Sequence, residues 1–112
     1  MRSVNILITQ DIAKKIDAES RSAAVRDIAS TIIEAYEQGA EWVISEIHRR
    51  VVDSSPKKRR EDEKNGVIWE KAIVWIPEAM KREIERLSVP NNLRVSEFLR
   101  GAVIYATDDK KP

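Results

Sequence analysis

The fold is decided by residues 4–16, Val-Asn-Ile-Leu-Ile-Thr-Gln-Asp-Ile-Ala-Lys-Lys-Ile, whose pattern returns in residues 72–84 as Ala-Ile-Val-Trp-Ile-Pro-Glu-Ala-Met-Lys-Arg-Glu-Ile. In each copy, apolar residues first alternate with other residues and then recur at helical spacing. A period of two predicts a strand with one buried face, and the change of period predicts a helix directly after it. The chain is therefore expected to contain the order strand, then helix, twice.

The alternation gives each strand an inner and an outer face. The inward residues are Val4, Ile6 and Ile8 of a strand over 3–8, and Ala72, Val74 and Ile76 of a strand over about 69–76. The outward residues are Ser3, Asn5, Leu7, Trp69, Lys71, Ile73 and Trp75. A half of about 40 residues buries too little surface to be stable alone. We therefore expect the two strands to pair antiparallel in one chain, over a shared core of four or five helices.

Each strand leads into two helices. Thr9 or Asp11 can cap a short helix that ends near residue 20, and Ser22 is expected to cap a longer one that stops at Gly39. After the second strand, Ser96 is expected to cap the last helix. The spacing differs between the copies: Ser22 lies 6 residues after Ile16 in the first copy, and Ser96 lies 12 residues after Ile84 in the second. The first helix of the first copy is therefore shorter by more than a turn.

The middle of the chain divides the two copies. Residues 40–52 carry an apolar stripe, and residues 53–66 form a charged segment that we expect to be an exposed linker. This gives three parts: a first copy over 1–39, a helix with a basic linker over 40–66, and a second copy over 67–112. The stripe can serve self-association or pack against the chain's own core; its members are Trp42, Val43, Ile47 and Val51.

Composition excludes several classes of function. The chain has no cysteine and one histidine, so no metal centre or cofactor is expected, and no nucleophile–base pair indicates an enzyme. No apolar run approaches ~18 residues and no secretory leader is evident, so a cytoplasmic protein without a membrane partner is expected. The net charge is +1, yet residues 49–66 alone carry seven basic and four acidic side chains.

Two further motifs carry a family resemblance. Arg21-Ser22-Ala23-Ala24-Val25-Arg26 is echoed by Arg94-Val95-Ser96-Glu97-Phe98-Leu99-Arg100. With the strands before them, these motifs resemble the ribbon-helix-helix (MetJ/Arc) superfamily over residues 3–38 and 70–107. The resemblance implies a mainly α fold with a two-stranded antiparallel β-ribbon, here as an intrachain pseudo-dimer of tandem copies. It implies sequence-specific binding of double-stranded DNA through the ribbon in the major groove, as a transcription regulator or repressor.

The tandem arrangement is also similar to small transcription regulators of archaeal viruses, which would place the protein in the cytoplasm of a host cell. Family members occupy neighbouring half-sites, so we expect at least a homodimer or cooperative loading on DNA.

The outward ribbon residues are the candidates for base contact: Ser3, Asn5, Leu7, Lys71, Ile73 and Trp75. An Asn amide can bind adenine at two atoms, and Lys71 can reach guanine or a phosphate. The apolar members can contact thymine methyl groups, meet another protein, or be covered by residues 40–52. For Trp75, packing against protein is favoured, because a Trp is seldom exposed without a partner.

The candidates for phosphate contact lie at helix starts and in the linker: Arg2, Arg21, Ser22, Ala23, Arg94, Ser96, Lys57, Lys58, Arg59 and Arg60. A helix N-terminus carries partial positive charge and accepts a phosphate oxygen. The two serines can equally be plain caps, and the linker cations can simply be solvated.

Two other functions remain open. One is a protein-interaction module of antitoxin type that also binds DNA, and the other is a protein that coats DNA without sequence preference.

Overall fold

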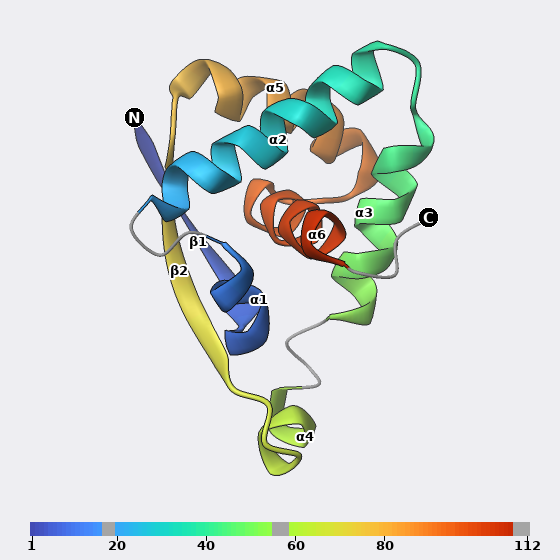
Figure 1. Ribbon diagram of the computed structural model, residues 1–112. Coiled ribbons are helices and arrows are strands. Elements are labelled where there is room, and N and C mark those ends of the chain that lie inside the picture. Colours follow the sequence, from blue (N-terminus) through green and yellow to red (C-terminus); the bar gives the residue numbers. More distant parts are fainter. Residues whose placement is uncertain (17–19, 55–58, 109–112) are drawn as a thin grey trace.

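A two-stranded antiparallel ribbon forms within the chain, as predicted. The computed structural model describes residues 1–16, 20–54 and 59–108. Strand β1 (Arg2–Thr9) pairs with β2 (Trp69–Ile76), so that Arg2 lies opposite Ile76 and Thr9 opposite Trp69. The rest of the described chain is mostly helical, and the helices lie to one side of the ribbon (Figure 1). The other face of the ribbon is left open, except at Trp69.

One core joins the inner face of the ribbon to the two long helices, α2 (Arg21–Glu37) and α6 (Val95–Thr107). Its completely buried members include Ile8, Val25, Val74, Phe98 and Leu99. Full burial of such a side chain stabilises the fold by about 1.5–3 kcal/mol. Because these residues come from both ends of the sequence, neither half has a core of its own, which agrees with the expectation from chain length.

The helices that follow the strands differ in length, as the spacing predicted. Helix α1 (Gln10–Lys15) has 6 residues, and helix α5 (Glu78–Ser88) has 11. The hydroxyl of Thr9 accepts a hydrogen bond from the backbone N–H of Ile12, so Thr9 is the cap of α1. A short 3-10 turn, η2 (Val89–Asn91), then leads from α5 towards α6.

Helix α3 (Trp42–Asp53) lies against α6 and uses most of the apolar stripe for this contact. Val43, Ile47 and Val51 are buried, so the stripe packs mainly against the chain's own core. A Cβ at Gly101 would lie 2.8 Å from the Ile47 carbonyl oxygen, which means that only glycine allows so close an approach of the two helices. Trp42 is the exception in the stripe, with 57% of its surface exposed.

The segment expected to be a plain linker contains a helix, α4 (Arg59–Lys64). The carboxylate of Asp62 accepts a hydrogen bond from the indole N–H of Trp69 at 3.0 Å. Trp69 is 8% exposed, so the prediction that it faces solvent is wrong. The alternation of β2 places Trp69 on the outer face, but the chain before β2 folds back over it. The alternation of residues along a strand cannot reveal such a tertiary contact.

Candidate nucleic-acid interface

The outer face of the ribbon gathers all six residues predicted to contact bases. The register places Ser3 opposite Trp75, Asn5 opposite Ile73, and Leu7 opposite Lys71. Since alternate residues project to the same side of a sheet, these three pairs form one continuous surface.

This surface is open, and the strands contribute no negative charge to it. Asn5 and Lys71 are exposed, while Ile73 and Trp75 are 56% and 50% exposed. Residues 40–52 therefore do not cover these apolar side chains, and that alternative is wrong. Glu70 is the only acidic residue in either strand, and the alternation places it on the inner face. From the strands, an anionic ligand would meet one cation and no carboxylate on the outer face.

The start of α2 is fastened to the end of β2. The Ser22 hydroxyl accepts a hydrogen bond from the backbone N–H of Trp75 at 3.0 Å, and Arg26 donates to the Trp75 carbonyl at 2.8 Å. Because α2 already begins at Arg21, Ser22 is the second helical residue and not its cap, which corrects the prediction. These two bonds fix the helix start beside the ribbon.

The two long helices start in different electrostatic settings. Helix α2 has no acidic residue in its first turn, and Ser20, which precedes it, makes no capping hydrogen bond with its side chain. Helix α6 follows Arg94, whose backbone N–H donates to the Glu97 carboxylate at 2.9 Å. Ser96 is the second residue of α6, so its predicted capping role is also wrong. The partial positive charge at the start of α2 favours an anion there, whereas the Glu97 carboxylate already supplies the negative charge at the start of α6.

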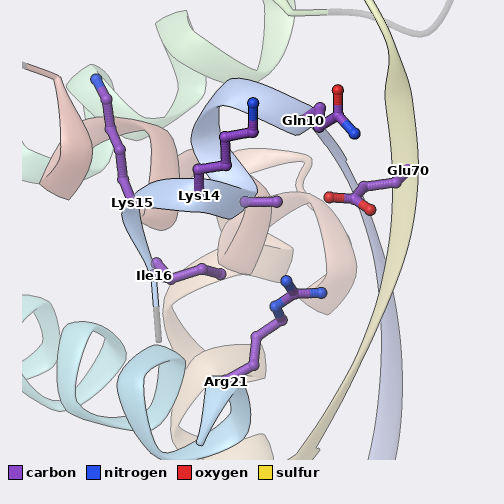
Figure 2. Close-up of a pocket in the computed structure, with 7 residues that line it drawn as sticks. Gln10, Lys14, Lys15, Ile16, Arg21 and Glu70 are labelled. Carbon is purple, nitrogen blue, oxygen red and sulfur yellow. The ribbon is translucent and has the colours of Figure 1, made fainter. Parts of the chain in front are cut away.

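A polar hollow of about 620 Å³ lies next to the start of α2 (Figure 2). Its lining residues are Gln10, Ala13, Lys14, Lys15, Ile16, Arg21 and Glu70. Arg21 points into this hollow, and its Nε is buried without a hydrogen-bond partner. Lys15 donates to the Thr107 carbonyl, but Lys14 is exposed at the rim. Lys14 and Arg21 outnumber the single carboxylate of Glu70 among the lining residues, which favours an anion in the hollow.

The sequence reasoning missed Lys14. Its signal was the adjacent pair Lys14 and Lys15 at the end of the expected short helix. Only the fold shows that this helix end lies beside the start of α2.

Arg2 is held by a carboxylate at one end of the ribbon. Its Nε donates to Glu78 at 2.7 Å, and both side chains are about half exposed or more. The hydrogen bond from Arg2 holds the pKa of Glu78 below its usual range. A phosphate that approached Arg2 would therefore compete with Glu78.

The other predicted phosphate contacts differ in availability. Arg94 and Arg60 are exposed, while Lys57, Lys58 and the side chain of Arg59 lie outside the described residues. In the neighbouring basic region, Arg50 is buried and paired with Glu46 and Asp108, so it is committed to the fold.

Within residues 1–16, 20–54 and 59–108, no three His, Cys, Asp or Glu side chains are grouped as a metal site would require, and no helix is long and apolar enough to cross a bilayer. A scan of family models, a search of curated proteins and a search of solved structures each found no match to this chain.

Proposed function

We propose that this protein binds double-stranded DNA sequence-specifically, as a tandem ribbon-helix-helix transcription regulator whose β-ribbon enters the major groove. The observation that carries the proposal is the register of the ribbon. It assembles Asn5, Lys71 and their neighbours from both ends of the sequence on one open face to which neither strand contributes a carboxylate. The major groove admits a two-stranded ribbon of this kind.

Each part of the outer face has a chemical counterpart in the groove. The amide of Asn5 can donate to N7 or accept from N6 of adenine, and Lys71 can donate to O6 and N7 of guanine. Ile73, half exposed next to them, offers apolar contact to thymine methyl groups. These contacts would carry the sequence preference, because phosphate contacts position a protein without reading bases.

The start of α2 is the proposed phosphate-binding site, called the phosphate seat below. The helix has no acid in its first turn and is fixed beside the ribbon by Ser22 and Arg26. Arg21 and Lys14 add two cations within the same hollow. Together they suit a phosphate group that flanks the groove, with Arg2 and Arg60 as further cations along the duplex.

An interaction module of antitoxin type is the second candidate. The half-exposed Ile73 and Trp75 favour it, since exposed apolar groups side by side often mark a protein contact. Such a module would use the same face for a protein, with DNA binding as a second activity.

Selection from random double-stranded DNA tests the proposal, followed by footprinting of the enriched sequence. The proposal predicts an enriched motif, protection of the major groove, and affinity that falls with salt according to the number of phosphate contacts. Replacing Arg21 by Ala should weaken all sequences alike and flatten the salt dependence by about one contact. Binding without an enriched motif would mean DNA coating. Absence of DNA binding at low salt would leave the interaction module as the better account.

A further inference from the structure

Trp42 is an exposed aromatic residue whose stripe partners are already buried. It begins α3, has 57% of its surface exposed, and touches Tyr105 edge to face with ring centroids 6.5 Å apart. Within the part of the chain that the structure describes, its indole N–H has no hydrogen-bond acceptor. A Trp with a free N–H and a large exposed ring is the kind of side chain that anchors protein interfaces.

A hollow of about 270 Å³ lies between α2 and α6 on the same side of the molecule. Its lining residues are Asp27, Ile28, Thr31, Ile32, Tyr105 and Ala106. Most of this lining is apolar, which suits an aromatic ring. The Asp27 carboxylate accepts no hydrogen bond from any described residue, so the hollow also offers an acceptor that lacks a donor.

The exposed ring and the hollow are neighbours, because Tyr105 touches Trp42 and also lines the hollow. One face of the chain thus holds a protruding group and a recess that accepts it, with a free donor on the first and a free acceptor in the second. A patch that contains both members of a complementary pair can bind a second copy of itself around a two-fold axis.

We propose that two copies of this chain dock through this face, with Trp42 of each copy entering the hollow between α2 and α6 of the other. The indole ring fills the apolar part of the hollow, and its N–H donates to Asp27. Each dimer then contains two identical contacts. As in any monomer–dimer equilibrium, the association depends on protein concentration.

The dimer leaves the ribbon free. Figure 1 shows the ribbon and α3 on opposite sides of α6, and Trp42 begins α3. The contact does not use the outer face of the ribbon, so the proposal stands whether or not that face binds DNA.

Sedimentation equilibrium without DNA tests the proposal over a range of protein concentrations. The wild type should show a monomer–dimer equilibrium. Trp42→Ala removes the protruding ring, and Ala106→Phe fills the hollow from within; each should weaken association by at least about tenfold. Trp75→Ala is the matched control, because it removes another half-exposed Trp on the ribbon and should leave association unchanged.

A mixture of the two variants separates this contact from any other surface. The Trp42→Ala chain keeps its hollow, and the Ala106→Phe chain keeps its Trp42, so the mixed dimer regains one of the two contacts. The mixture should therefore associate more strongly than either variant alone. A monomeric wild type, an unchanged Trp42→Ala variant, or a mixture no better than its components would each overturn the proposal. Circular dichroism of each variant checks that the fold is kept.

Discussion

Strand β1 and helix α2 differ in surface chemistry from strand β2 and helix α6, although both halves have the order strand, helix, helix. On the outer face, β1 presents Ser3 and Asn5 where β2 presents Trp75 and Ile73, while the third pair is reversed, with Leu7 on β1 opposite Lys71 on β2. At the helix starts, α2 is free of acidic residues in its first turn, whereas α6 carries Glu97 there. The two halves have the same order of elements, yet their surfaces differ both on the ribbon and at the helix starts.

The difference suggests that the two halves contribute differently to binding and to packing. Under the proposed function, the half made of β1 and α2 would hold a phosphate and contribute Asn5 to base reading, while β2 contributes Lys71 and α6 contributes more to packing. Helix α6 is covered by α3 along Gly101, while the aligned residue of α2, Asp27, lines an open hollow. The two residues are aligned because Asp27 lies five residues after Ser22, and Gly101 lies five residues after Ser96.

The largest effect is expected at the covered helix. Gly101→Val would force atoms into the space of Ile47 and Val51 and should lower the free energy of unfolding by about 3 kcal/mol, as overpacking does. Asp27→Val, at the aligned position of α2, should change it by less than about 0.5 kcal/mol, because that site is exposed. Urea denaturation at low protein concentration measures both. Equal effects would show that the two helices are covered alike.

The next effect concerns base reading. Asn5→Ala should cost about 1–3 kcal/mol at the preferred DNA site and little on random DNA, because it removes a contact to a base. Ile73→Ala, directly opposite, should cost about 1 kcal/mol or less, since it removes only apolar contact. Competition binding with specific and random duplexes gives both ratios. If Asn5→Ala left the ratio unchanged while Ile73→Ala lowered it, the reading half would be β2.

A reciprocal exchange tests the helix starts. Ala23 of α2 and Glu97 of α6 are both third residues of their helices. Ala23→Glu should weaken binding to all DNA sequences by about tenfold, because a carboxylate would occupy the phosphate seat. Glu97→Ala should not weaken DNA binding, although the loss of its bond to Arg94 should reduce stability. Titration at several salt concentrations measures the outcome, and a neutral Ala23→Glu variant would exclude α2 as the seat.

The smallest effect is expected at the end of the ribbon. Glu78→Gln frees Arg2 from its ion pair and should tighten DNA binding by less than about fivefold, since exposed ion pairs contribute little. Glu83→Gln, on the same helix and with the same change of charge, is the control. A gain of equal size in both variants would reflect net charge alone. No gain in either would mean that Arg2 does not approach the DNA.

The strand pairing was predictable because it rests on a pattern that is local and redundant. Val4, Ile6 and Ile8 leave only one face to bury, and a shift of one residue would expose all three. The shortened α1 followed from residue counting alone. These features need no knowledge of what lies next to them in space.

The features that the sequence analysis missed depend on how the chain folds back on itself. Serine is a common helix cap, but the hydroxyl of Ser22 accepts a hydrogen bond from the backbone N–H of Trp75. Helix α2 begins one residue before it, at Arg21. Trp69 has outward parity, but Asp62 and the chain around it fold over the ring. Lys14 joins the hollow at α2 only because α1 is short. In each case a contact made by the folded chain overrides a local preference.

The ribbon has one more consequence, which concerns how the protein can change. In a ribbon made by two identical chains, each substitution appears twice, at positions related by symmetry, so a residue that suits one strand must also suit the other. Here Asn5 faces Ile73 because the two strands are encoded separately. Each position of the surface can therefore be altered alone, and a gain on one strand is not tied to a loss on its partner.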